Sequence, residues 1–285
     1  MNSIKSDFEE KGYVVIPNII NSEEIREYIS EFNKWFSSIP NMNEFHSIIS
    51  SSGIFKYHEV GHQRFAWLLR TNPKIIDVFK SFWDTDELVT SFDGCCYYPS
   101  NYVGKDSCWT HSDQSSLKKG RQCIQSFVSL TSNSERTFVV YEGSHKLHED
   151  HSDTYNIEDP SDWYMIEPEY LEKIQDKKRI LKVDAGSLVL WDSRTFHQNT
   201  CSNSECKEER LVQYLCYLPK NNANNDEQMQ NKRKYYFNTY RTTSHYPYPM
   251  GAVPLQPLYD EFEIDYNSLE YPVLDDLLDK IKVLL

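Results

Sequence analysis

The sequence lacks several features that would assign the protein to a class at once. Among its 285 residues there is no run of about 18 apolar residues, the length that a transmembrane helix needs. Basic residues are in deficit, with 30 Lys and Arg against 43 Asp and Glu, so the net charge is −13. This balance argues against non-specific binding to nucleic acid or to an anionic membrane. We therefore expect neither kind of partner.

The cysteines form no recognisable framework. Seven are present, an odd number at irregular spacings, and no C-x-x-C pair occurs among them. A disulfide scaffold or a thioredoxin-like motif is therefore not indicated, and reduced thiols are expected. The N-terminal segment has no signal-peptide hydrophobic region, and the last residues carry no peroxisomal or ER-retention address. From these observations we expect a cytoplasmic location; the sequence does not indicate an oligomeric state.

Aromatic residues, in contrast, are plentiful. They make up 14% of the chain, with 20 Tyr and 14 Phe, within a total apolar content of 39%. This composition allows a packed core and favours a sheet-rich body with an aromatic pocket or cover.

The order of patterns along the chain predicts helices first and strands second. Residues 22–36 have apolar side chains at helical spacing after an Asn21 cap, with Glu24 completing a capping box. A second helix is expected after Asn72, with Pro73 in its first position. From residue 87 onward, short β-branched and aromatic runs separated by turns predict an antiparallel barrel or jelly roll.

We expect a single domain over 1–285. It would comprise an N-terminal mixed and helical support (1–86), a jelly-roll core (87–218) and a C-terminal extension that covers the core (219–285). Within the extension, residues 221–234 are expected to be an exposed polar excursion, and the chain is expected to end in an amphipathic helix.

Two motifs compete for a metal ion. The first, His58-Glu59-Val60-Gly61-His62, matches the H-E-x-x-H signature of zinc peptidases, which needs both His on one face of a helix. Gly61 disfavours that helix by about 1 kcal/mol relative to Ala. A third ligand at the customary spacing is also missing, because position 68 is Leu68. We therefore prefer a packed loop and short helix here, and keep a zinc metallopeptidase as an alternative.

The second motif has the spacing of a non-haem iron site. His111 and Asp113 form an H-x-D pair just before a predicted strand, and alternate residues of an extended chain point the same way. His197 follows another predicted strand and completes two His and one carboxylate, the set that holds Fe(II) while leaving sites for a bidentate co-substrate and O2. Arg210 opens the next strand, where its planar fork suits the distal carboxylate of 2-oxoglutarate.

At these residues the sequence resembles the phytanoyl-CoA dioxygenase-like family of Fe(II)/2-oxoglutarate oxygenases. The similarity includes "WTHSDQS" (109–115), "FVVYEGSHK" (138–146) and "GSLVLWDSRTFHQ" (186–198), and it extends over roughly residues 8–218. In the upstream stretch the similar part is "GHQ…W", so the resemblance treats Glu59 as incidental.

The resemblance implies a mainly β fold with flanking helices, a double-stranded β-helix of the cupin-like jelly-roll type. It implies an enzyme that hydroxylates a small molecule with release of succinate and CO2, using Fe(II), 2-oxoglutarate and O2. Retention of Asp113 argues for hydroxylation, because halogenating relatives have a small residue there. No basic cluster for coenzyme A phosphates is evident, so the substrate of the family's namesake is not carried over.

Further residues are candidates for the site. Gln125 and Asn199 could hydrogen-bond the co-substrate, or could belong to networks within the strands. For the substrate the candidates are Arg194, which could instead pair with Asp192, and Arg241 and His245, which could instead belong to a packed cover. His145, His148 and His151, spaced three residues apart, are expected in a solvated loop. A non-catalytic cupin-like binding protein remains the competing class.

Overall fold

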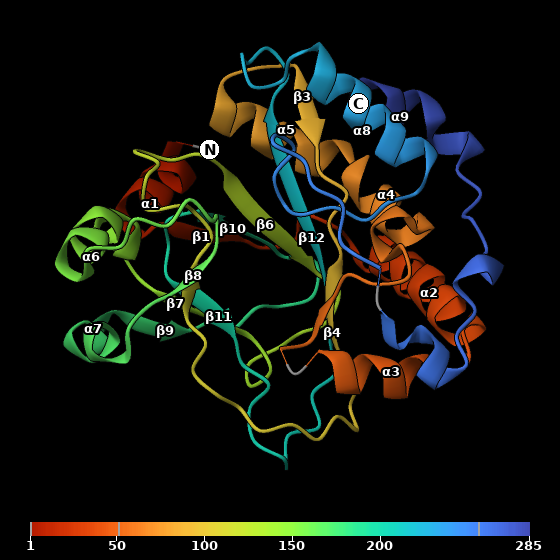
Figure 1. Cartoon of the computed structure of the whole chain (residues 1–285), viewed down its shortest axis with the longest axis horizontal. Coiled ribbons are helices and arrows are strands. Elements are labelled where there is room, and N and C mark those ends of the chain that lie inside the picture. The colour runs from red at the N-terminus through yellow and green to blue at the C-terminus, as the bar shows by residue number, and fades with distance from the viewer. Residues whose placement is uncertain (1, 51, 256) are drawn as a thin grey trace.

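The computed structural model describes residues 2–50, 52–255 and 257–285. Its core is two antiparallel sheets (Figure 1). The strands are β1 (Tyr13–Ile16), β2 (Ile54–Phe55), β3 (Leu88–Thr90), β4 (Cys95–Tyr98), β5 (His111–Ser112), β6 (Ile124–Ser129), β7 (Phe138–Tyr141), β8 (Tyr164–Met165), β9 (Lys178–Ile180), β10 (Leu188–Asp192), β11 (His197–Asn199) and β12 (Arg210–Pro219). The larger sheet has the order β1-β10-β6-β12-β4-β2, with β3 also paired to β12, and the smaller has the order β8-β5-β11-β7-β9.

This architecture is the predicted cupin-like jelly roll. Strands that are distant in sequence alternate within each sheet, as β10 lies between β1 and β6, and β11 lies between β5 and β7. The strand β6 shows how the two faces are used. Its Phe127 packs with Phe138 and Trp191 in one apolar cluster, whereas Val128 belongs to the cluster that also contains helix residues. Neighbouring side chains of a strand point to opposite faces, so one strand contributes to two cores.

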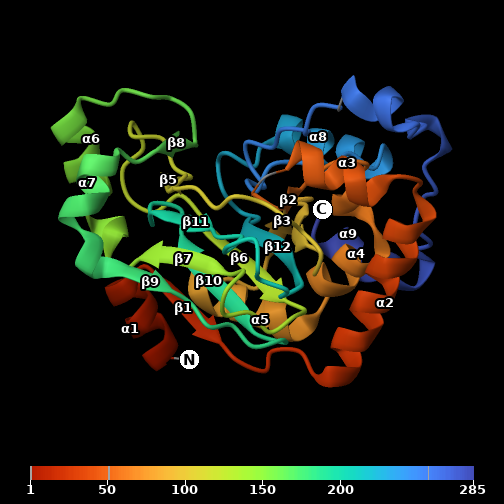
Figure 2. The ribbon, with the colours of Figure 1, turned by 90° about the horizontal axis from the view of Figure 1, so that it is seen from below.

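Helices cover the sheets on both sides. They are α1 (Asn2–Lys11), α2 (Ser22–Ser38), α3 (Met42–Ile49), α4 (Arg64–Arg70), α5 (Pro73–Trp83), α6 (His148–Tyr155), α7 (Pro168–Lys173), α8 (Glu227–Asn238) and α9 (Leu278–Val283). Figure 2 shows α6 and α7 at one end of the molecule and α2, α3 and α4 at the other. No helix in the described ranges is long and apolar enough to cross a bilayer.

Helices α2 and α5 begin as their caps predict. The Asn21 side chain accepts from the Glu24 amide at 3.0 Å, and the Glu24 carboxylate accepts from the Asn21 amide at 2.7 Å. This reciprocal pair satisfies two amides that a helix start leaves free. At the start of α5, the Asn72 side chain accepts a hydrogen bond from the Lys74 amide at 3.0 Å, and Pro73 occupies the first helical position.

The C-terminal extension is more ordered than the sequence indicated. Residues 221–234 are not simply an exposed excursion, since α8 begins at Glu227 and its Arg233 is buried. That guanidinium donates to the Pro247 carbonyl and to the Asn225 side chain, both at 2.8 Å.

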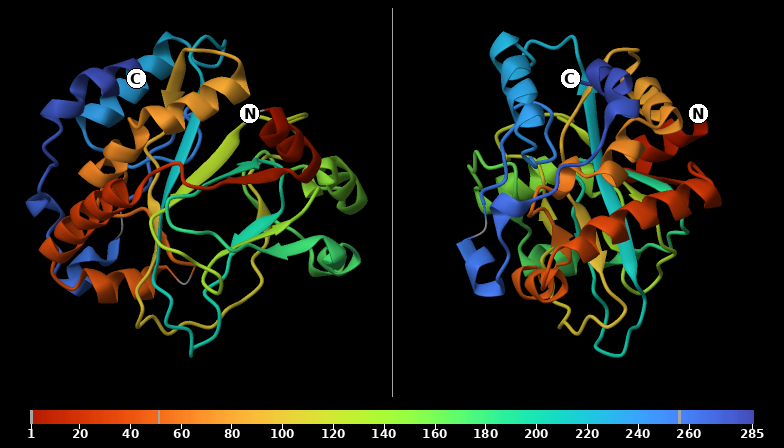
Figure 3. Two further views of the ribbon diagram at one scale, coloured as in Figure 1. Left: turned by 180° about the vertical axis from the view of Figure 1, so that it is seen from behind. Right: turned by 90° about the vertical axis from the view of Figure 1, so that its right-hand side faces the viewer.

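Phe237 of α8 packs against the apolar cluster that contains Ile281 of α9 and Trp67 of α4. Figure 3 shows α8 and α9 on the side of the molecule that also carries α4 and α5. The extension therefore packs on the N-terminal helices, and the division of one domain into three segments stays a prediction.

Candidate active site

The three predicted iron ligands lie together. Asp113 Oδ1 is 3.6 Å from His111 Nε2, and Asp113 Oδ2 is 3.3 Å from His197 Nε2. Strand pairing brings the two His together, because His197 of β11 is directly opposite His111 of β5. In the described part of the chain this is the one group of three or more acidic, His or Cys side chains whose ligand atoms converge.

Hydrogen bonds fix both imidazoles for metal binding. The Nδ1 atoms face backbone carbonyls, that of His111 at 3.1 Å from Trp109 O and that of His197 at 2.8 Å from Thr195 O. A proton on each Nδ1 leaves each Nε2 lone pair free, which is the arrangement that metal-binding His residues adopt. The donor set and its orientation therefore fit Fe(II).

The carboxylate is oriented and kept ionised. Gln125 Nε2 donates to Asp113 Oδ2 at 2.9 Å. Burial raises the pKa of Asp113, but attraction from His111 and hydrogen bonds from His111 and His197 outweigh it and hold that pKa well below its usual range. Burial, with repulsion from His111, lowers the pKa of His197. Both shifts favour the protonation states that bind a metal ion.

Arg210 meets the requirements of an anion anchor. Its side chain is 1% exposed, donates to Cys96 Sγ at 3.0 Å and lies over the Phe127 ring. Its Nη2 has no hydrogen-bond partner among the described residues, and no ion pair to it is found there. Burying a guanidinium without an acid is costly, so a carboxylate of 2-oxoglutarate fits this position.

Asn199 connects the anchor region with the cavity. Its Nδ2 donates to the Tyr214 hydroxyl at 2.9 Å and approaches Cys96 Sγ at 3.7 Å, the same sulfur that Arg210 contacts. Its Oδ1 is buried and has no partner in the part of the chain that the structure describes. Of the two predicted co-substrate contacts, Asn199 therefore keeps an amide oxygen that can accept a hydrogen bond. Gln125 instead donates its amide nitrogen to the Asp113 carboxylate.

A cavity of about 770 Å³ opens beside the triad. Aromatic side chains form much of its wall, and residues of the C-terminal extension close one side. Its lining includes His111, Asp113, His197, Asn199, Tyr214, Trp109, Trp163, Tyr57, Asp93, His245 and Tyr246. A cavity of this size accepts a small molecule.

Two of the three predicted substrate residues lie elsewhere. Arg194 donates through Nε and Nη2 to the Asp192 carboxylate at 2.9 and 2.8 Å and does not line this cavity, so the ion-pair alternative is the correct one. Arg241 is held by Glu59 and by the Val253 carbonyl. His245 does line the cavity, and its Nε2 is buried without a partner in the described ranges.

Asp93 also borders the cavity, although it belongs to no motif in the sequence. The side chain is 4% exposed, and its Oδ1 has no hydrogen-bond partner in the residues described. Burial raises the pKa of Asp93 to about 6, although attraction from His245 and Arg70 opposes that rise. Because no motif surrounds it, only the folded arrangement reveals Asp93.

The H-E-x-x-H motif forms no metal site. His58 and Glu59 have positive φ angles of 50° and 52°, and only Val60–His62 follow as a short 3-10 helix. The two His are therefore not one α-helical turn apart. His62 Nε2 contacts the Arg241 carbonyl at 3.0 Å, while the His58 amide donates to the Tyr259 hydroxyl.

Glu59 is not incidental. Its carboxylate accepts from Arg241 Nε at 3.1 Å, from the Thr242 amide and from the Tyr266 hydroxyl. All three donors belong to the C-terminal extension, and the Glu59 side chain is 5% exposed. This carboxylate therefore fastens the extension that closes the cavity.

We expect Glu59→Ala to lower the free energy of unfolding by about 3–5 kcal/mol. The substitution leaves the mostly buried Arg241 guanidinium, the Thr242 amide and the Tyr266 hydroxyl without their carboxylate acceptor. Thermal unfolding and limited proteolysis after residue 238 measure the effect. Glu44→Ala, at an exposed position of α3, is the matched control and should change neither. Wild-type stability in Glu59→Ala would contradict this role.

The His residues at 145, 148 and 151 are buried, not solvated. His148 Nε2 lies 3.0 Å from the Gln114 carbonyl, and His151 Nε2 contacts the Glu167 carboxylate. They occupy a 3-10 turn (Ser144–Lys146) and α6, and their partners differ. Although its sequence is polar, α6 packs against the loop that follows β5.

Comparison with known proteins agrees with this geometry. A model of the phytanoyl-CoA dioxygenase (PhyH) family matches residues 8–206. The chain belongs to this family. This PhyH member is an Fe(II)- and 2-oxoglutarate-dependent enzyme, and the side chains of its His111–Asp113–His197 triad fit Fe(II) binding.

Among curated proteins, this PhyH chain is similar to Ava biosynthesis cluster protein O of Aspergillus versicolor. The two are 26% identical over 267 residues, which cover 86% of this chain and 85% of that protein. Solved structures with the same fold include HygX from Streptomyces hygroscopicus with nickel, 2-oxoglutarate and hygromycin B (TM-score 0.52, 14% identity, 78% of this chain and 88% of that one). Another is the carbocyclase SnoK from nogalamycin biosynthesis (TM-score 0.53, 14% identity, 77% and 84%).

Proposed function

We propose that this PhyH enzyme hydroxylates a small molecule, with 2-oxoglutarate converted to succinate and CO2. The observation that carries the proposal is the buried Arg210 guanidinium, which lacks an acid partner in the described residues and contacts Cys96 Sγ, the sulfur that Asn199 of the cavity wall also approaches. The His111–Asp113–His197 triad lines the same cavity. A binding protein without chemistry has no use for this combination. The retained Asp113 carboxylate supports hydroxylation over halogenation.

The chain's own residues divide the work. His111, Asp113 and His197 would hold the iron, which supplies the oxidising chemistry when O2 and 2-oxoglutarate are bound. Arg210 would hold the distal carboxylate of the co-substrate, with Asn199 beside it. Gln125 keeps Asp113 in its orientation. The aromatic walls exclude water, which strengthens the interactions with charged groups inside the cavity.

We place the polar part of the substrate near His245 and Asp93. Each offers a buried atom without a partner in the described ranges, and both line the cavity that contains the triad. Buried polar atoms are nearly always hydrogen-bonded, so a ligand group that satisfies both would gain affinity there. This assignment also gives the cover formed by the C-terminal extension a part in substrate binding.

Succinate release tests the proposal. With Fe(II), ascorbate and 2-oxoglutarate, we expect slow uncoupled succinate formation that stops when iron is chelated. Candidate small molecules that accelerate it should gain one oxygen atom, labelled when isotopic O2 is supplied. A product with no added oxygen would favour ring closure or epimerisation over hydroxylation. If the iron-loaded protein formed no succinate under any condition, the alternative of a non-catalytic binding protein would be favoured.

A further inference from the structure

Trp163 is a half-exposed aromatic residue at the metal centre. It lines the cavity, and its side chain is 48% exposed. The centroid of its ring is 5.6 Å from that of His111, at an interplanar angle of 34°. Trp109 already packs on the imidazole of His111, with 4.9 Å between the ring centroids and an interplanar angle of 16°. The half-exposed Trp163 ring is therefore available to contact a molecule bound in the cavity.

Strand pairing sets the backbone of Trp163. In the pairing of β5 with β8, Ser112 is opposite Tyr164 and His111 is opposite Met165. Continuing this register by one residue brings Trp163 opposite Asp113. Directly opposed side chains of an antiparallel pair project to the same side, which is the side of the metal ligands.

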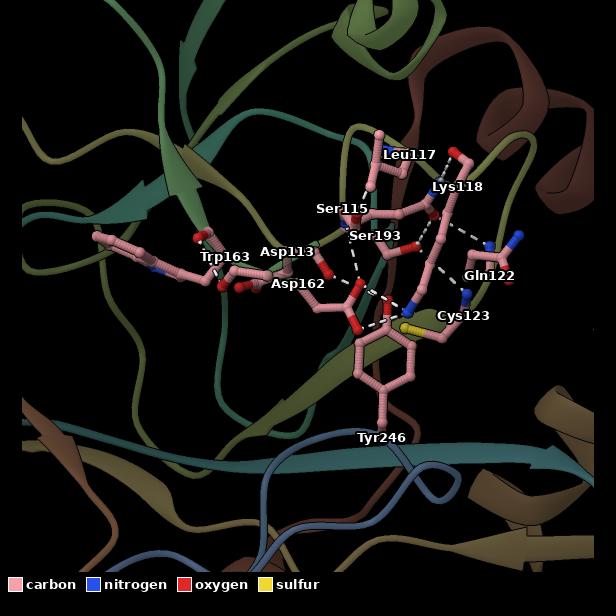
Figure 4. Close-up of polar contacts among 12 residues, drawn as sticks. Asp113, Ser115, Leu117, Lys118, Gln122, Cys123, Asp162, Trp163, Ser193 and Tyr246 are labelled. Atoms are coloured by element: carbon pink, nitrogen blue, oxygen red, sulfur yellow. Dashed lines mark hydrogen bonds and ion pairs between the residues drawn. The ribbon is translucent and has the colours of Figure 1, made fainter. Parts of the chain in front are cut away.

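Asp162 fixes the segment before β8 (Figure 4). Its carboxylate accepts from the Ser115 amide at 3.0 Å and from Lys118 Nζ at 2.8 and 2.6 Å. A second tie is the Ser115 hydroxyl, which donates to the Asp159 carbonyl at 2.6 Å. These bonds join the segment carrying Trp163 to the loop that follows the H-x-D motif.

Lys118 extends this connection to the C-terminal extension. Its Nζ lies 5.2 Å from the centroid of the Tyr246 ring, within the range of a cation–π contact. The Tyr246 hydroxyl donates to the Asp113 carbonyl at 3.1 Å. The position of Trp163 is thus tied, through Lys118 and Tyr246, to the backbone of a metal ligand.

A rigid, half-exposed indole bordering a cavity suits one kind of ligand. Leaving this apolar surface in water forgoes the free energy that its burial would give. Because the segment is already fixed, a ligand that covers the ring pays little to order it. Flat π systems gain from offset stacking beyond what the buried area alone provides.

We propose that Trp163 is a specificity-determining residue that stacks against a planar, unsaturated ring of the substrate. Lys118 and Asp162 are positioning residues that hold it there. This inference rests on the proposed function, since it deepens the substrate class of the same cavity.

Two probes that differ in planarity test the inference. The holoenzyme is loaded with Ni(II), which does not turn over, and 2-oxoglutarate; binding of 2-naphthol and of its saturated counterpart decahydro-2-naphthol is then measured by calorimetry. We expect wild type to prefer the planar probe. Trp163→Ala should reduce the affinity for it on the order of tenfold, and Trp163→Phe should retain most of it. The exposed Tyr235 on α8 provides the control, because Tyr235→Ala should change nothing.

The chain also offers a matched pair for the positioning role. Lys118→Met removes the ion-pair partner of Asp162. Lys119→Met removes a neighbouring, exposed ion pair, in which Lys119 Nζ lies 3.0 Å from the Glu149 carboxylate. We expect Lys118→Met to weaken the planar probe severalfold and Lys119→Met to leave it unchanged. Equal behaviour of the two variants would overturn the role of Lys118.

Three results would overturn the assignment of Trp163. They are equal affinity of wild type for both probes, unchanged affinity in Trp163→Ala, or loss of the Fe(II)–2-oxoglutarate absorption band in Trp163→Ala, which would make the residue a support for His111. Failure of the proposed function looks different, because wild type itself would then show no such band.

Discussion

Replacing His111 or Asp113 by Ala should abolish Fe(II) binding and succinate formation while the protein still folds. The two side chains supply two of three ligands, and Asp113 alone supplies the negative charge. Each substitution removes one side chain from a small polar cluster and leaves the pairing of the two sheets unchanged, so the variants should still fold cooperatively. The decisive comparison is therefore made within each variant, with and without metal.

Thermal unfolding with and without metal measures this directly. A ligand at about 100 times its dissociation constant stabilises the folded state by about 2.7 kcal/mol. We expect Ni(II), under anaerobic conditions, to raise the unfolding temperature of wild type and of His58→Gln, but not that of His111→Ala or Asp113→Ala. His58→Gln is the informative control, because a zinc site in the H-E-x-x-H motif would lose its metal there. Metal stabilisation that survives in His111→Ala would refute the assignment.

The convergence of His111 and Asp113 was predictable because their geometry is local. In an H-x-D motif at a strand end, alternate residues share a face, so the sequence alone aligns His111 with Asp113. His197 could be added because a predicted strand and turn precede it. The same locality explains why the starts of α2 and α5 were predicted, since Asn21 and Asn72 cap residues only two or three positions away.

The contacts that could not be predicted join residues that are distant in the sequence. Glu59 and Arg241 are 182 residues apart, and neither position carries a pattern that names the other. The H-E-x-x-H pattern would make Glu59 a catalytic residue and the family resemblance makes it incidental, whereas in the fold its carboxylate fastens the extension. Likewise, only the folded arrangement shows that Asp93 Oδ1 is buried without a hydrogen-bond partner among the residues described.

Polar composition was the other source of error. The His-rich stretch from 145 to 151 and the Asn-rich stretch before α8 both look solvated as sequences. In the structure both His148 and Arg233 are buried, and each has a backbone-carbonyl partner, Gln114 for His148 Nε2 and Pro247 for Arg233 Nη2. A polar residue is exposed by default, but a carbonyl from a distant segment removes the cost of burying it.

Arg210→Ala should weaken 2-oxoglutarate binding while leaving the metal site in place. The guanidinium is buried beside Cys96 and Phe127, without an acid partner in the described part of the chain. Removing one member of a buried charge pair costs about 2–5 kcal/mol, so the dissociation constant should rise by at least tenfold. Arg210→Lys keeps the charge but not the planar fork, and should fall between wild type and Arg210→Ala.

Anaerobic titration of the Fe(II) protein with 2-oxoglutarate, followed by the visible charge-transfer band, provides the measurement. Arg194→Ala is the matched control: Arg194 follows β10, a strand of the same sheet as β12, but its guanidinium is paired with Asp192 and does not line the cavity. Equal 2-oxoglutarate affinity in wild type and Arg210→Ala, with the band intact, would mean that another group binds the distal carboxylate. Loss of affinity in Arg210→Ala alone would establish co-substrate and anchor together, because a structural arginine would have no reason to respond to 2-oxoglutarate.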